Sequence, residues 1–96
     1  MAKFRNVESM GVGVFEFYCQ GCECFHNVWT NKNEAPCWNF NGDVNFPTIS
    51  PSILVTRPLP VKPEICHSFI NNGKIQYLSD CSHSLKGQTI DLTDLA

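Results

Sequence analysis

The chain has 96 residues, of which 43% are hydrophobic and 17% are charged, and its formal net charge at pH 7 is -2. This length predicts a single domain spanning residues 1–96. The weakly acidic balance provides no basic field for a phosphate backbone, so the sequence has no strong nucleic-acid signature. No apolar run approaches the about 18 residues of a membrane span, and residues 1–10 lack the apolar segment of a signal peptide, which predicts a cytosolic protein without a membrane partner.

The first elements expected along the chain are a lead-in at residues 1–11 and a β-hairpin at residues 12–30. The runs VGVFEFY and FHNVWT are rich in β-branched and aromatic residues, which favours two strands. Between them lies CQGCEC, a tight reversal that contains a CxxC pair, Cys19 and Cys22. The hairpin is therefore expected to end in a cysteine knuckle.

Residues 38–57 predict an aromatic hairpin and a further strand. Asn41-Gly42 is a favoured hairpin turn and lies between short aromatic segments. In the proline-rich stretch that follows, Ser52 to Arg57 can form a regular strand, near a sheet edge because proline removes backbone donors. Residues 58–63 are expected to be an extended, proline-rich connector.

Residues 65–83 read ICHSFINNGKIQYLSDCSH and predict a hairpin centred on the turn Asn72-Gly73. Alternation along its strands places Cys66 and Cys81 on one face, and His67 with Asp80 on the other. The tail at residues 88–96 supplies one more short strand. The whole pattern predicts a mainly β fold: a small, zinc-stabilised antiparallel sheet or sandwich of hairpins with little or no helix.

The six cysteines favour metal binding over a disulfide framework, because thiols stay reduced in the cytosol. A CxxC knuckle and a distant thiol pair can close a tetrahedral Zn²⁺ site, which would strengthen a thin core. A redox role for the CxxC is disfavoured because no helix follows it. The preferred ligands are Cys19, Cys22, Cys66 and Cys81, the alternative ligands are His83, His67 and His26, and Cys24 and Cys37 are expected to pack as small apolar residues.

Catalytic residues are not fixed by a motif, since HExxH and GxSxG are both absent. If the cysteines hold a structural zinc ion, the histidines are free for other work. The candidates are then His67, His83 and Asp80, with or without a second metal ion. Trp38 and Phe40 belong either to the core or to a surface that contacts a ligand.

The motifs FYCQGC, PTISPSILV, CHSF and GKIQYLSDCSH resemble a family of small phage and prophage proteins of unknown function. Many members carry the label ammonia monooxygenase, which does not fit, because that enzyme is a membrane-bound copper protein of several subunits. The resemblance covers residues 15–92. It implies expression in the cytoplasm of a bacterial host and a role at the contact between phage and host, with counter-defence as one form of it.

The function expected first is therefore a zinc-binding phage accessory protein that acts as an interaction module. Its partner would be a host or phage protein, or a small ligand. The alternative is a metal-dependent hydrolase that acts on a nucleotide or another small molecule through His67, His83 and Asp80.

Overall fold

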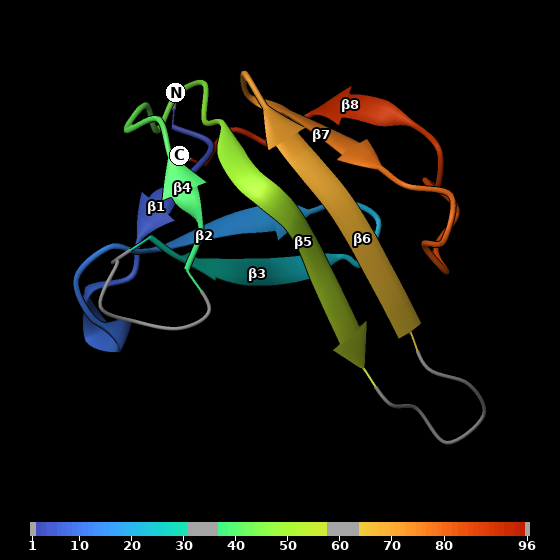
Figure 1. Ribbon diagram of the computed structural model, residues 1–96, viewed down its shortest axis with the longest axis horizontal. Coiled ribbons are helices and arrows are strands. Elements are labelled where there is room, and N and C mark those ends of the chain that lie inside the picture. Colours follow the sequence, from blue (N-terminus) through green and yellow to red (C-terminus); the bar gives the residue numbers. More distant parts are fainter. Residues whose placement is uncertain (1, 31–36, 58–63, 96) are drawn as a thin grey trace.

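The computed structural model describes residues 2–30, 37–57 and 64–95, which form two antiparallel sheets. The strands of one sheet cross those of the other steeply (Figure 1). The first sheet has the order β1-β2-β3, with strands at Arg5–Asn6, Val14–Cys19 and Cys24–Trp29. The second has the order β4-β5-β6-β7-β8, with strands at Asn39–Phe40, Ile49–Arg57, Glu64–Asn71, Lys74–Tyr77 and Thr89–Asp91. The predicted mainly β fold is confirmed.

The lead-in is more structured than its sequence indicates. Strand β1 pairs with β2, and Phe4 just before it is 1% exposed in the core. Within the described ranges, the helical content is one three-residue 3-10 turn, η1 at Glu8–Met10. No helix in this part of the chain is long and apolar enough to cross a membrane.

The knuckle hairpin forms as predicted, with β2 and β3 paired from Val14↔Trp29 to Cys19↔Cys24. Residues that lie opposite each other share a face, so His26 faces the core together with its partner Phe17. Both side chains are buried. This register brings a histidine to the same side of the hairpin as Cys19.

The second predicted hairpin also forms, with Ile70 opposite Ile75 across the Asn72-Gly73 turn. Both turn residues have positive φ, 51° and 78°, as a type I′ turn requires. The regular alternation expected as far as Cys81 would pair Cys66 with Ser79, but the β6–β7 ladder ends at Tyr77. After Leu78 donates to the His67 carbonyl, the chain turns, and Cys81 N–H donates to the Leu78 carbonyl.

The aromatic hairpin differs from the prediction. Strand β4 pairs with Ile49 and Ser50 rather than with the aromatic segment that directly follows Asn41-Gly42. The reason is local: the side-chain oxygen of Asn41 accepts from the backbone of Asp43 and Thr48, which holds a wider loop. Strand β5 starts before Ser52 and passes a register shift between Ile49 and Ile53. The predicted connector at 58–63 lies outside the described residues.

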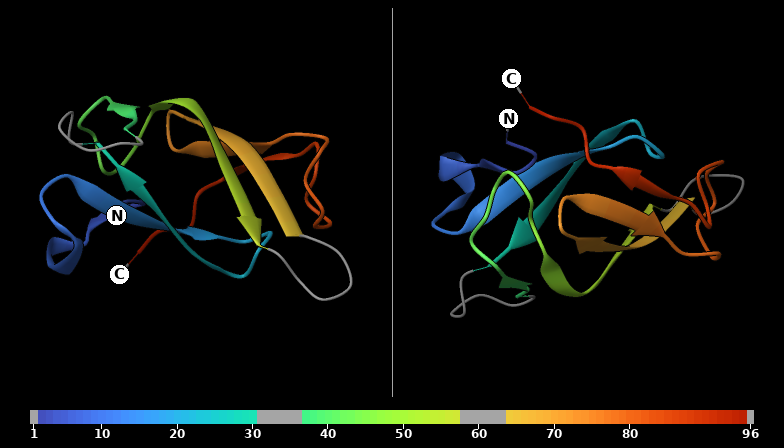
Figure 2. Two further views of the ribbon diagram at one scale, coloured as in Figure 1. Left: turned by 60° about the horizontal axis from the view of Figure 1, so that its bottom comes forward. Right: turned by 90° about the horizontal axis from the view of Figure 1, so that it is seen from above.

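The core lies between the two sheets, which Figure 2 shows from two further sides. The second sheet contributes its inner face, and Phe4, Phe17 and Val28 pack against it from the first. Along β6, Cys66 and Ser68 are buried, while His67 between them faces outward. Consecutive residues of β6 therefore serve two different sides of the sheet.

Candidate functional site

A chain of three hydrogen-bonded side chains crosses the outer face of the second sheet. The hydroxyl of Ser52 lies 3.0 Å from Nε2 of His67. Nδ1 of the same imidazole lies 3.0 Å from Oδ2 and 3.3 Å from Oδ1 of Asp80. The side chain of His67 is 26% exposed and that of Asp80 is 56% exposed, so the group is open to solvent.

Three elements of the sheet position this group. Leu54 lies opposite His67 in the β5–β6 register, and Ser52 precedes Leu54 by two residues on the same face. Asp80 belongs to the turn that begins where β7 ends, which brings its carboxylate back to the imidazole. The hairpin geometry predicted from sequence had placed His67 and Asp80 together, and their contact agrees with it.

The arrangement is that of a serine, histidine and acid triad. An imidazole with its proton on Nδ1 donates to the Asp80 carboxylate and leaves Nε2 to accept the Ser52 proton. Such a pair of hydrogen bonds prepares a serine hydroxyl to act as a nucleophile. The geometry is therefore suited to attack on a carbonyl group.

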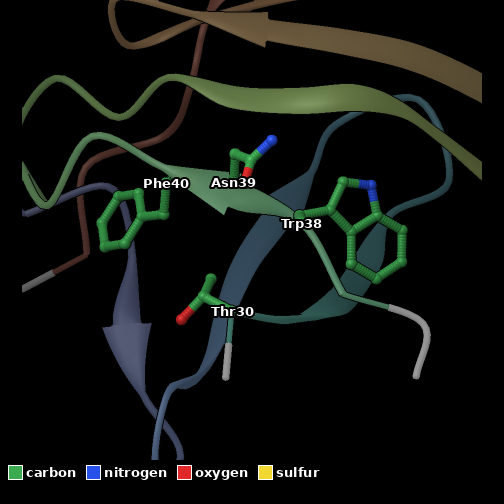
Figure 3. A pocket seen from close by; sticks show the side chains of 4 residues that line it. All are labelled: Thr30, Trp38, Asn39 and Phe40. Carbon is green, nitrogen blue, oxygen red and sulfur yellow. The ribbon is translucent and has the colours of Figure 1, made fainter. Parts of the chain in front are cut away.

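Trp38 supports Ser52 from the side of β4. Its indole N–H donates to the Ser52 carbonyl at 3.3 Å. Trp38 also lines a pocket of about 290 Å³ together with Thr30, Asn39 and Phe40. Figure 3 shows the indole nitrogen turned toward the neighbouring strand and Phe40 on the far side of the pocket.

Cys81 holds the backbone of His67 rather than standing free. The His67 N–H donates to its sulfur at 3.2 Å, and its own S–H donates to the His67 carbonyl at 3.1 Å. The thiol is 4% exposed. Cys81 thus holds the backbone of His67 in place, and His67 is the residue that the neighbouring Asp80 contacts.

A second constellation lies on the opposite, inner side of β6. The ligand atoms of Cys19, Cys22, His26 and Cys66 all lie within 4.8 Å of one another, so this group can hold a metal ion. The sulfurs of Cys19 and Cys66 are 3.8 Å apart. Zn–S bonds of about 2.3 Å at the tetrahedral angle put two sulfurs about 3.8 Å apart, so the spacing fits a tetrahedral site.

The protons of this group are unevenly shared. A hydrogen bond from Cys66 lowers the pKa of Cys19 to about 3, and that same bond raises the pKa of Cys66. Burial raises the pKa of Cys22 to about 12. Nε2 of His26 is buried without a hydrogen-bond partner. A bound cation would replace the shared protons and give that nitrogen a partner.

Cys66 also lies near Cys81 and His83, which form a smaller group of potential ligands. Nδ1 of His83 accepts a hydrogen bond from the Leu85 N–H at 3.3 Å, which leaves the proton of a neutral imidazole on Nε2. Nε2 of His83 is buried without a hydrogen-bond partner, as is Nε2 of His26. The His83 ring packs against Gly21, where an added Cβ would lie 2.3 Å from it, and edge-on to Tyr77.

The comparison with protein families gives one match. The chain matches the model of the bacterial ubiquitination-like system serine protease family, BubE, over residues 3–78. The chain belongs to the BubE family. The matched segment contains Ser52, His67 and the ligand atoms of the Cys19 group, and it ends shortly before Asp80. Neither the curated proteins nor the solved structures gave a match.

The metal ligands expected from sequence are distributed differently in this BubE-family chain. Cys19, Cys22 and Cys66 lie together as preferred, but the fourth member of their group is His26, which had been an alternative, and Cys81 contacts His67 instead. Cys24 and Cys37 belong to neither group of ligands among the described residues, and both are half-buried.

The structure brings two of the three catalytic candidates into contact. His67 and Asp80 meet, whereas His83 lies beside Cys66 and Cys81. Ser52 was missed, because the strand PTISPSILV has no GxSxG elbow and its register against β6 depends on residues beyond the turn motifs. The sequence offers no signal that separates Ser52 from Ser50 and Thr56, which are also polar and stand at alternate positions of the same strand.

Proposed function

We propose that this BubE-family protein is a serine protease whose nucleophile is Ser52. The hydrogen-bonded chain from Ser52 through His67 to Asp80 carries the proposal. The description of the family as serine proteases supports it independently. Among the described residues, His67 and Asp80 belong to neither group of potential metal ligands, which favours a serine-based mechanism over the metal-dependent hydrolase expected as an alternative.

The proposed reaction follows from the proton positions. Nε2 of His67 takes the Ser52 proton as Oγ bonds to the scissile carbonyl carbon, and Asp80 stabilises the imidazolium that results. The imidazolium then gives this proton to the leaving amine as the C–N bond breaks, which leaves an acyl group on Ser52. Water then attacks the ester with His67 again as the base. The C–O bond to Ser52 breaks, the acid product is released and the Ser52 hydroxyl is regenerated.

A structural zinc ion is the second part of the proposal. Three thiols and one imidazole, drawn from the knuckle hairpin and β6, match a closed Zn²⁺ site. The cluster lies on the core side of the sheet, with Cys19 and Cys66 buried and Cys22 half-buried, and its four ligands would fill a tetrahedral site without an open position for a substrate. Zinc there would supply folding energy and take no part in peptide hydrolysis.

We also propose a cellular system for this protein. The family description supports a protein of a bacterial ubiquitination-like system as the substrate. All six cysteines are free, as expected in a bacterial cytoplasm. The phage accessory role and a host or phage partner, expected from sequence, stay predictions alongside it.

The test is covalent labelling with an alkyl fluorophosphonate, read by intact mass. One adduct is expected on the wild-type protein, located at Ser52 by peptide mapping. Ser52→Ala should abolish the adduct, while Ser84→Ala, which replaces an exposed serine elsewhere, should keep it. An unlabelled wild-type protein, or an adduct that survives Ser52→Ala, would refute the proposed nucleophile.

A further inference from the structure

Two exposed apolar side chains flank the Ser52–His67 pair. Leu54 lies opposite His67, and Phe69 follows His67 by two residues on β6. Leu54 is 58% exposed and Phe69 is 44% exposed. Because alternate residues of a strand share a face, both lie on the outer face that carries the nucleophile.

The core does not use these side chains. The inner face is filled by their neighbours Ile53, Ser68 and Ile70, which are at most 3% exposed. The solvent side of an antiparallel sheet normally carries polar residues. A leucine and a phenylalanine placed next to a reactive serine therefore indicate a contact surface rather than a leftover of folding.

The patch lies close to the Ser52 oxygen, so a substrate that reacts there would contact it with the residues next to the scissile bond. A carbonyl carbon has to come within about 3.5 Å of the Ser52 oxygen to react. Neighbouring positions on a pleated sheet have side chains about 4.5 to 8 Å apart. A polypeptide that places its scissile carbonyl at Ser52 would therefore have the residues beside that bond within reach of Leu54 and Phe69.

The shape and charge around the Leu54–Phe69 pair indicate which class of substrate it accepts. The patch is open, and the pockets described for the chain are lined by neither Ser52 nor His67, so the surface suits a polypeptide laid across the sheet. The exposed carboxylate of Asp80 adds negative charge beside His67, the residue that lies opposite Leu54. An acidic side chain of the substrate would lose water there and meet a like charge.

We infer that the Leu54–Phe69 patch is a substrate-binding surface that selects polypeptides with apolar side chains next to the bond to be cleaved. This inference rests on the proposed serine protease function and narrows its substrate class. Leu54 and Phe69 act here as specificity-determining residues, outside the proton-transfer chain.

Two tripeptidyl diphenyl phosphonates, one leucine-rich and one aspartate-rich, test the inference. Ser52 attacks phosphorus, His67 takes the serine proton, and a phenoxide leaves, so both probes report the same chemistry. The leucine probe should react about tenfold faster or more, the effect of one buried apolar side chain. Leu54→Asp should remove that preference. Thr56→Asp, which adds the same charge two residues farther along the same face of β5, should keep it.

The alkyl fluorophosphonate separates the two ways of failing. Equal rates for the two peptide probes, on a protein that the alkyl probe labels at Ser52, would overturn this inference and leave the protease proposal standing. No labelling by the alkyl probe would overturn both. The preference is the ratio of the leucine-probe rate to the aspartate-probe rate on the same protein, so a general change in the reactivity of Ser52 in Leu54→Asp cancels. A ratio near one in Leu54→Asp, with the wild-type ratio kept in Thr56→Asp, supports the inference, and a wild-type ratio in Leu54→Asp would overturn it.

Discussion

Asp80→Asn is the substitution that tests the triad most sharply. The Asp80 carboxylate lies 3.0 Å from Nδ1 of His67, and Nε2 lies 3.0 Å from the Ser52 hydroxyl. An asparagine amide can turn its NH₂ toward Nδ1, which moves the imidazole proton to Nε2. The imidazole then cannot accept the serine proton.

The size of the loss follows from exposure. In a buried triad the equivalent change lowers the rate about 10⁴-fold. Asp80 is 56% exposed, so an asparagine there can instead turn toward solvent and leave water to accept from Nδ1. The wrong tautomer is then favoured but not enforced. We expect fluorophosphonate labelling to slow about 10²-fold to 10³-fold, with little change in stability because an exposed ion pair contributes only about 0 to 1 kcal/mol.

The assay is the second-order rate constant of adduct formation, measured by intact mass. Asp91→Asn is the matched control, since it breaks the exposed Lys74–Asp91 pair on β7 and β8 and should leave the rate unchanged. A loss below about tenfold for Asp80→Asn would show that Asp80 does not set the imidazole tautomer. Ser52 and His67 would then have to work as a pair.

Three further outcomes are expected. Cys81→Ala removes both sulfur contacts to the His67 backbone, so it should lower the free energy of unfolding in urea by about 1–3 kcal/mol and slow fluorophosphonate labelling. Cys81→Ser should keep most of the stability and most of the labelling rate. Equal losses in the two variants would contradict a role of Cys81 in holding His67. Trp38→Phe removes the donor to the Ser52 carbonyl and should cost about 1 kcal/mol in the same titration without abolishing labelling. Elemental analysis should find about one zinc per chain, lost in His26→Ala and kept in Cys37→Ser, and a protein without zinc would refute the metal site.

Local turn chemistry is what made much of this fold predictable. Asn72-Gly73 fixes the β6–β7 register, and the register in turn places Cys66 inward and His67 outward. The prediction was wrong for the end of β7, where no turn motif in the sequence marks the change of direction. It assumed that β7 stays extended to Cys81, whereas the chain turns after Leu78 and the Cys81 thiol meets the His67 backbone.

Contacts between distant segments were not predictable in the same way. No hairpin turn motif in the sequence predicts the register of β5 against β6, so the approach of Ser52 to His67 could not be derived from local sequence. The same holds for His26, which joins Cys66 only because the two sheets pack on each other. A two-residue strand such as β1 carries too few residues to show a period.

The alternation of β6 ties the two sites together. Cys66 and His67 are consecutive, one facing the candidate metal group and the other facing Ser52. A slip of one residue in this strand would send each side chain to the wrong side of the sheet. A metal ion bound to Cys66 would therefore stabilise the register that the proposed triad needs, although it would lie on the opposite face. The Cys81 contacts hold the His67 backbone from the β7 side, so metal binding and these sulfur hydrogen bonds would both stabilise the position of the same imidazole.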